Sequence, residues 1–309
     1  MEAGLRSGFV AIVGRPNMGK STFLNRVLGR KVAIVTPKAQ TTRTRILGAC
    51  HRPGVQIVFL DTPGIHEVKG SPLNRTMVRT AREACRQVDL VLYFVSAPQG
   101  LLAEDLEIIR ALPRGDAPVI LVINKVDRMP ERPQLLPVLA RAGALARELE
   151  GGIAEMVPIS AQDGDNVEHL LEFLSARLPP GPAYFPEEMV TDQAEGFIAA
   201  EFVREQLFLR LRQELPYDLG VGLEHSEERD GRLHFHLVVL VNRHSQKGIV
   251  IGKGGSLLKD VGSHARAQLE HLFGVPVVLK IWVKVTEGWH GDMRRLRELG
   301  YEQDLDGAD

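Results

Sequence analysis

The chain has 309 residues, 44% of them apolar and 25% charged, which is the composition of a soluble globular protein with one large or two ordinary domains. A net charge of −1 excludes an overall basic surface, and two cysteines, Cys50 and Cys85, make neither a disulfide framework nor a zinc pattern. No apolar run approaches the ~18 residues of a membrane span, and the N-terminus lacks a signal-peptide core, so we expect a cytoplasmic protein.

The first 178 residues alternate short apolar runs with helical stretches. The expected strands cover residues 9–13, 55–60, 90–95, 119–123 and 156–159. The expected helices cover residues 20–28, 71–87, 102–112, 134–149 and 167–177. This alternation predicts an α/β domain with a mostly parallel sheet and helices on both faces. Residues 42–49 alternate polar and apolar side chains, which predicts one antiparallel strand at the sheet edge.

A proline-rich segment follows, with four prolines between residues 179 and 186, and a helix cannot continue through it. Beyond it we expect a smaller α+β domain. Its order is helix (195–214), strand (220–225), strand (233–242), a strand-like run ending in a glycine loop, helix (257–273) and strand (277–285). The predicted division is a first domain at 1–178, a linker at 179–190, a second domain at 191–300 and a tail at 301–309.

The stretch GRPNMGKST follows the first expected strand and opens the first expected helix, and it matches the phosphate-loop pattern G-x-x-x-x-G-K-S. Glycines let backbone N–H groups converge on a phosphate, while the helix N-terminus and Lys20 add positive charge. Ser21 offers an oxygen to Mg²⁺. The alternative is a plain glycine turn. The candidate nucleotide contacts are Gly14, Arg15, Pro16, Asn17, Met18, Gly19, Lys20, Ser21 and Thr22.

A second group of candidates ends the strand at 55–60, at the edge where open α/β sheets bind ligands. Asp61 is placed to reach Mg²⁺, and the Gly64 N–H to bond a terminal phosphate, with Thr62 and Pro63 between them. By itself this DTPG stretch would be read as a turn. In the polar loop at 37–43, Thr42 is a candidate third Mg²⁺ ligand, although a plain polar loop fits the spacing equally well.

Two further stretches, NKVD and SAQ, predict recognition of a guanine base. The Asp127 carboxylate is suited to accept hydrogen bonds from guanine N1 and N2, a donor pair that adenine lacks. Leaving it unpaired would cost roughly 1–3 kcal/mol, so the discrimination works through desolvation. We expect Asn124 to brace the loops, Lys125 to cover one base face, and the Ala161 N–H to meet guanine O6 beside Ser160, although SAQ by itself carries little information.

The second glycine loop, Gly252-Lys253-Gly254-Gly255, fits the pattern G-x-x-G, and the stripe of the following helix faces a core. Such a loop can clamp a single-stranded nucleic-acid backbone. Between residues 244 and 300 nine basic residues outnumber five acidic ones, although a solvated face is the alternative. The apolar Ile249 and Ile251 are predicted either to support bases or to join the core. The candidate RNA contacts are Lys247, Gly252, Lys253, Gly254, Gly255, Lys259 and Arg266.

Taken in order, GRPNMGKST, PKAQTTR, DTPGIH, NKVD and SAQ resemble the Era family of GTPases, and IVIGKGG resembles the type II KH domain that this family carries. The resemblance covers essentially the whole chain, and it implies GTP and GDP as ligands with Mg²⁺ as cofactor. It further implies a GTP-hydrolysing switch that binds 16S rRNA near its 3′ end during 30S subunit assembly. A monomer with no DNA partner is expected, and the family is also described as peripherally membrane-associated.

Slow hydrolysis is expected because Ile65 stands where many GTPases have a water-orienting glutamine. We expect Lys20, Thr42 and Gly64 to support catalysis, together with Asn17. Asn17 is predicted to help bind K⁺, on the resemblance to GTPases that pair such an asparagine with an apolar residue at the Ile65 position. The alternative is that Asn17 merely shapes the loop.

Two other function classes remain open at this point. One is an ATP-dependent small-molecule kinase, against which the NKVD stretch argues. The other is a nucleotide-stabilised RNA scaffold whose hydrolysis is incidental.

Overall fold

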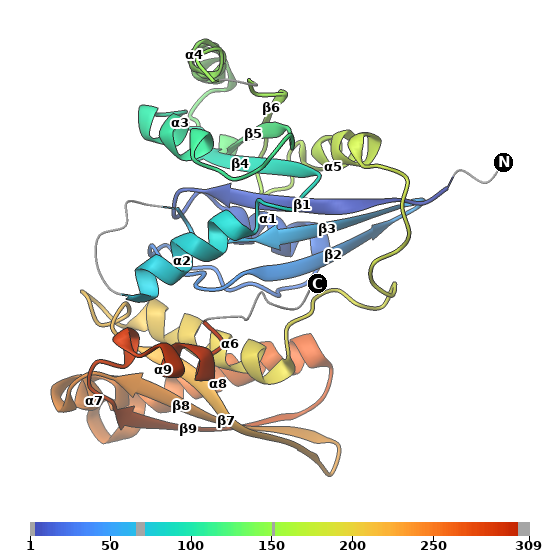
Figure 1. Cartoon of the computed structure of the whole chain (residues 1–309). Coiled ribbons are helices and arrows are strands. Elements are labelled where there is room, and N and C mark those ends of the chain that lie inside the picture. Colours follow the sequence, from blue (N-terminus) through green and yellow to red (C-terminus); the bar gives the residue numbers. More distant parts are fainter. Residues whose placement is uncertain (1–3, 66–71, 150–151, 302–309) are drawn as a thin grey trace. The chain divides into compact units, whose positions relative to one another are not determined.

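The computed structural model describes residues 4–65, 72–149 and 152–301, so the predicted tail beyond residue 301 and residue 71 of the expected second helix lie outside the described residues (Figure 1). The described chain forms two compact units, which divide between residues 192 and 193. Residues 34–44, and helix α2 (Pro72–Glu83) as far as Thr76, belong to the second unit although they precede the division in sequence.

The first unit contains a six-stranded sheet in the order β2-β3-β1-β4-β5-β6. β2 is antiparallel to β3 at the edge, and the other pairs are parallel, which confirms the predicted fold class. β2 begins at Ile46, four residues after the predicted start of this strand at residue 42. The strands are β1 (Arg6–Gly14), β2 (Ile46–Arg52), β3 (Val55–Asp61), β4 (Leu90–Ser96), β5 (Val119–Asn124) and β6 (Glu155–Pro158).

Helices cover both faces of this sheet. Successive strand residues point to opposite sides, so each face presents apolar side chains to the helices that cover it. On one face, α1 (Lys20–Leu28) and α5 (Val167–Arg177) pack in one core with Val10 and Ile12 of β1. On the other face, Ala11 and Val13 share a core with residues of α2, α3 (Ala103–Arg110) and α4 (Leu135–Ala146). Short 3₁₀ turns occur at Val126–Arg128 and Arg132–Gln134.

The proline-rich segment is bonded to the first unit by its backbone. Ala49 of β2 donates its N–H to the Val190 carbonyl at 2.9 Å, and Thr191 donates its hydroxyl to the Leu47 carbonyl at 2.7 Å. Gln56 donates to the Phe185 carbonyl at 2.7 Å. These bonds occupy groups that an edge strand would otherwise expose. The segment therefore runs from β1, where Ser7 donates its N–H to the Pro179 carbonyl at 3.1 Å, past Gln56 of β3 to the edge strand β2.

The second unit is a three-stranded sheet with helices against one face, which matches the expected smaller α+β domain. β7 (Gly220–Arg229) is antiparallel to β8 (Arg232–Val241), and β8 is parallel to β9 (Val277–Val285). The helices and turns are α6 (Glu195–Arg210), α7 (His244–Ile251), a 3₁₀ turn (Lys253–Gly255), α8 (Ser256–Phe273), a 3₁₀ turn (Trp289–Gly291) and α9 (Met293–Glu298). No helix in the described part of the chain is long and apolar enough to cross a membrane.

The strand-like run predicted before the second glycine loop is wrong, because these residues form α7. Val250 is fully buried, Ile251 is partly buried against the same core, and Ile249 is 55% exposed, which is the pattern of a helix face. The Gln246 side chain accepts the N–H groups of Asn242 and Arg243 and stabilises the helix start. The β-branched residues of this run favour a strand, but helix capping and burial outweigh that preference here.

Candidate nucleotide site and glycine loop

The phosphate loop adopts a shape that its residue types make possible. Gly14, Asn17 and Gly19 all have positive φ angles, of 142°, 64° and 92°. A Cβ at Gly14 would lie 2.5 Å from the Phe94 carbonyl oxygen, and one at Gly19 would lie 2.2 Å from Asn124 Nδ2. Glycine is therefore required at both positions by space as well as by conformation.

Lys20 is 6% exposed, and its ammonium group donates to the carbonyl oxygens of Gly14 and Arg15, each at 3.1 Å. Burial lowers the pKa of Lys20 to about 8, although the Asp61 carboxylate acts in the opposite direction. The loop thus holds a buried cation next to main-chain N–H groups, which suits a phosphate. The Arg15 guanidinium is bonded elsewhere, to Asp105 Oδ1 at 2.8 Å.

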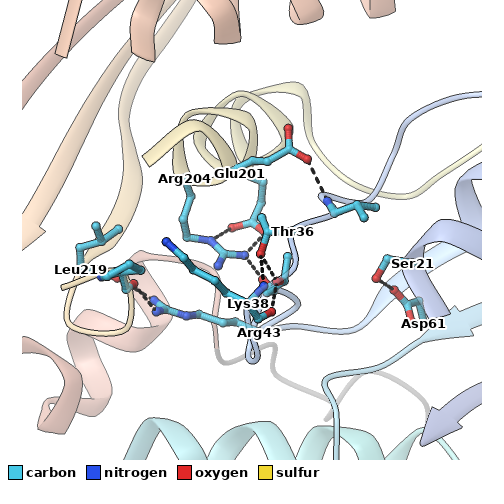
Figure 2. Close-up of polar contacts among 12 residues, drawn as sticks. Ser21, Thr36, Lys38, Arg43, Asp61, Glu201, Arg204 and Leu219 are labelled. Carbon is cyan, nitrogen blue, oxygen red and sulfur yellow. Dashed lines mark hydrogen bonds and ion pairs between the residues drawn. The ribbon is translucent and has the colours of Figure 1, made fainter. Parts of the chain in front are cut away.

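Asp61 is fully buried at the end of β3, and its Oδ2 accepts the Ser21 hydroxyl at 2.7 Å (Figure 2). Among the described residues, its Oδ1 has no hydrogen-bond partner. Burial raises the pKa of Asp61 to about 6, while Lys20 and Ser21 lower it. A buried carboxylate oxygen without a partner, beside a hydroxyl, fits a hard cation such as Mg²⁺.

The rest of the DTPG stretch joins the two loops. Thr62 donates its hydroxyl to the Ile12 carbonyl at 2.9 Å, so its side chain supports β1. A Cβ at Gly64 would lie 2.6 Å from the Pro16 nitrogen, and Ile65 donates its N–H to the Gly14 carbonyl at 3.1 Å. Ile65 is 4% exposed, so its side chain belongs to the core. The Met18 side chain is 5% exposed and also joins a core.

The NKVD and SAQ stretches lie together at the ends of β5 and β6. Asn124 donates to the Met18 carbonyl at 2.8 Å and accepts the Ala161 N–H at 2.9 Å. Ser160 donates its hydroxyl to Asp127 Oδ1 at 2.7 Å, and Asp127 itself is exposed. Lys125 donates to the Asn17 carbonyl. The structure therefore brings these stretches and the phosphate loop together, as the sequence predicts.

Thr42 lies in residues 34–44, which belong to the second unit, whereas Ser21 and Asp61 belong to the first. Its neighbour Arg43 is 1% exposed and donates to the carbonyl oxygens of Leu219 at 2.7 Å and Tyr217 at 3.1 Å. Figure 2 shows the bond between Arg43 and Leu219. The Arg43 guanidinium also lies 5.6 Å from the Phe208 ring centroid. We call residues 34–44, with their contacts to α6 and to residues 216–219, the anchored segment.

Three more side chains, those of Arg204, Lys38 and Glu205, fix the anchored segment to α6. Arg204, which is fully buried, binds both carboxylate oxygens of Glu201 and donates to the Thr41 carbonyl. Lys38 donates to carbonyl groups at the C-terminal end of the helix, and Glu205 accepts the Val35 N–H at 2.8 Å. Cations at a helix C-terminus complement its partial negative charge.

The second glycine loop lies between α7 and α8. Gly252, Gly254 and Gly255 have φ angles of 77°, 58° and 79°, and a Cβ at Gly254 would meet no atom within 4 Å. Lys253 and Gly254 are exposed. Lys259 and Arg266, both exposed, are seven residues apart on α8, so they share one side of it, while Lys247 is partly buried on α7.

Arg43, Glu201 and Arg204 are not among the functional residues that the sequence predicts. In the sequence, Arg43 is the last residue of PKAQTTR, and no neighbouring residue indicates that its partners lie at residues 216–219. The available signal was the polar pattern of α6, where charged residues interrupt an otherwise apolar helix. Fully buried charged residues of this kind are rare unless they are paired.

Two family models match this chain. One, described as "50S ribosome-binding GTPase", matches residues 9–125, and the other, described as "KH domain", matches residues 214–290. The chain is 48% identical to the GTPase Era of Geobacter metallireducens, across 96% of this chain and 98% of that protein. It is 43% identical to the GTPase Era of Syntrophus aciditrophicus, across 96% of each chain.

Solved structures agree with these matches. A variant of Aquifex aeolicus Era bound to GDP and AlF₄⁻ superposes with a TM-score of 0.92 at 39% identity, across 97% of this chain and all of that one. An Era protein in complex with MgGDPNP and nucleotides 1506–1542 of 16S ribosomal RNA gives the same TM-score, identity and coverage. The similarity includes both units.

We predict that Mg²⁺ affinity falls at low pH because the ion must displace a proton from Asp61. The pKa of this group is raised to about 6, so it is ionised above that pH and protonated below it. Below pH 6 the apparent Mg²⁺ affinity of the nucleotide complex should fall about tenfold per pH unit, as expected for one proton. Titration of Mg²⁺ at pH 5, 6 and 7 checks this. A flat profile, or the same slope in Asp61→Asn, would contradict it.

Proposed function

Because this chain belongs to the Era family of GTP-binding, RNA-binding GTPases, we propose that it binds 16S rRNA near its 3′ end and acts in assembly and maturation of the 30S subunit. The observation that carries this proposal is the match, over 97% of the chain, to an Era protein that holds both MgGDPNP and 16S rRNA. The protein acts as a cytoplasmic monomer with RNA, not DNA, as its nucleic-acid partner.

In this proposal the first unit binds GTP. Main-chain groups of residues 14–19 and the Lys20 ammonium hold the phosphates, while Ser21 and Asp61 hold Mg²⁺, which supplies positive charge on the phosphates. The exposed Asp127 carboxylate reads guanine, and Ser160 fixes its position through the 2.7 Å hydrogen bond. The second unit binds single-stranded RNA through the glycine loop and the basic side of α8.

The anchored segment supplies the coupling between nucleotide and RNA. When GTP is bound, Thr42 joins the Mg²⁺ shell, and on hydrolysis it leaves. Thr42 is bonded through its peptide to Arg43, whose guanidinium is held by the carbonyl groups of residues 216–219. In this proposal a change at Thr42 reaches the carbonyl groups of residues 216–219 through one peptide bond, within the second unit.

Hydrolysis is slow without assistance, because the Ile65 side chain is buried and carries no group that could orient water. We propose that a K⁺ ion beside the phosphates, bound in part by Asn17, supplies the missing positive charge. Asn17 lies in the phosphate loop with a φ of 64°, and its backbone carbonyl accepts the Lys125 ammonium.

RNA binding through the glycine loop is tested by the double variant Lys253→Asp/Gly254→Asp. Aspartate tolerates the positive φ at Gly254, and there is space for its side chain. Because two carboxylates would face the phosphates, affinity for an oligoribonucleotide matching the 3′ end of 16S rRNA should fall at least about a hundredfold. Fluorescence anisotropy at fixed salt measures this, and GTP affinity should not change.

The matched control is Gly231→Asp/Arg232→Asp in the β7–β8 turn. Gly231 also has a positive φ, of 68°, and free space, and Arg232 is exposed. This control should retain RNA affinity. Equal losses in the two double variants would place the RNA site elsewhere.

Coupling through the anchored segment is tested by Arg43→Ala. Wild-type protein should bind RNA more tightly with a non-hydrolysable GTP analogue than with GDP, and in the variant the ratio of the two dissociation constants should approach one. Arg212→Ala, which removes an exposed arginine of the same unit, should keep the wild-type ratio. Because both tryptophans lie in the second unit, their fluorescence checks that Arg43→Ala is folded. An unchanged ratio in a folded variant would refute this route.

The K⁺ role is tested by measuring GTP turnover in KCl and in NaCl at equal ionic strength. Turnover in K⁺ should exceed that in Na⁺ by about tenfold or more, since one added charge at the phosphates is a large electrostatic contribution. The variant Asn17→Ala should lose this difference. Equal wild-type rates in the two salts would remove the cation from the mechanism.

A further inference from the structure

Arg26 connects the phosphate-binding helix to the loop that follows β6. It lies in the last turn of α1, the helix that begins with Lys20. Its Nε donates to the Ala161 carbonyl at 2.6 Å, and its Nη2 donates to the Gln162 carbonyl. Among the described residues, no other hydrogen bond is made to these two carbonyl groups.

The Ala161 backbone is held on both sides. Its N–H is donated to Asn124 Oδ1 at 2.9 Å, while its carbonyl accepts from Arg26. Ala161 is 2% exposed, so these backbone groups have little access to water. Rotation of either peptide at this residue would break one of the two bonds and leave a buried polar group unpaired.

The loop also leaves space for the arginine. Gly164 has a φ of 94°, and a Cβ there would lie 2.9 Å from Arg26 Nη1. The Gly164 N–H is donated to the Ser160 carbonyl at 2.8 Å, which closes the loop on itself. Glycine at this position therefore serves both the turn and the approach of the guanidinium.

From Arg26 the contacts lead to the group that reads the base. Ser160 precedes Ala161, and its hydroxyl donates to Asp127 Oδ1 at 2.7 Å. Among the described residues, the exposed Asp127 carboxylate has no other hydrogen bond that would fix its orientation. Its position relative to a bound base therefore depends on how firmly residues 160–162 are held.

We propose that Arg26 is a positioning residue for base recognition: by holding the carbonyl groups of Ala161 and Gln162, it keeps Ser160 and Asp127 in place, and so sets both the preference for guanine and the rate of GDP release. The proposal rests on the assignment of Asp127 as the guanine-reading group. Because Arg26 and Lys20 belong to one short helix, the base and phosphate ends of the nucleotide are held by a single rigid element.

The test compares nucleotide release and affinity in Arg26→Ala and wild type, for GDP and for IDP. IDP lacks only the 2-amino group, whose hydrogen bond Asp127 would accept. In Arg26→Ala the release of fluorescent GDP, followed by stopped flow, should become about tenfold faster. The ratio of GDP to IDP affinity should fall by a similar factor. Arg26→Lys, which has a single ammonium group for the two carbonyls, should be intermediate in both measurements.

Arg110→Ala is the matched control. Arg110 is also an exposed arginine in the last turn of a helix, and it donates to the Glu148 carbonyl at 3.3 Å, outside the nucleotide site. This variant should keep wild-type release and wild-type preference, and circular dichroism should show all variants folded.

Each outcome decides one of the two claims. If Arg26→Ala loses GDP and IDP affinity equally, so that the ratio is unchanged, or if release is unchanged, then Arg26 does not position the reading group and the inference is overturned. If wild-type protein itself shows no preference for GDP over IDP, the assignment of Asp127 fails instead, independently of Arg26.

Discussion

The side-chain amide of Asn124 is the contact on which the nucleotide site depends. It is 1% exposed at the end of β5, and it bonds the phosphate loop through the Met18 carbonyl and the base loop through the Ala161 N–H. The planar amide offers a donor and an acceptor side by side, so one side chain can bond both loops. Parallel strands deliver their following loops to one edge of the sheet, and Asn124 fixes the spacing of two of those loops there.

The same edge contains two buried charges that are incompletely paired within the described chain. Lys20 donates to neutral carbonyl groups, and one oxygen of Asp61 has no partner among the described residues. Burial disfavours the charged form of both groups, which is why the pKa of Lys20 is lowered and that of Asp61 is raised. A phosphate and a divalent cation would supply the opposite charges that are missing. Ligand binding and stability of the first unit are therefore linked.

Much of the fold and most of the nucleotide site could be predicted because their signals are local. The phosphate loop needs a strand, small residues and a helix in immediate succession, and the DTPG and NKVD stretches directly follow buried strands. The partners of Arg43 and Arg26 could not be predicted, since each lies more than a hundred residues away and is a backbone carbonyl, which every residue carries. The helix α7 was missed because β-branched residues favour strands, whereas burial of Val250 decides the outcome.

The anchored segment joins two requirements in adjacent residues. Thr42 is proposed to contribute to the nucleotide site, while Arg43 is buried among carbonyl groups of the second unit. A buried charge favours the arrangement that keeps its partners, since removing one partner of a buried ion pair costs about 3–5 kcal/mol. The proline-rich segment, in contrast, is bonded to the edge of the first sheet through Ala49 and Thr191. In the proposed coupling, Thr42 and Arg43 both belong to the second unit, and one peptide bond joins the residue proposed to sense the nucleotide to the residue held by residues 216–219. A route through the proline-rich segment would first have to break its bonds to the sheet.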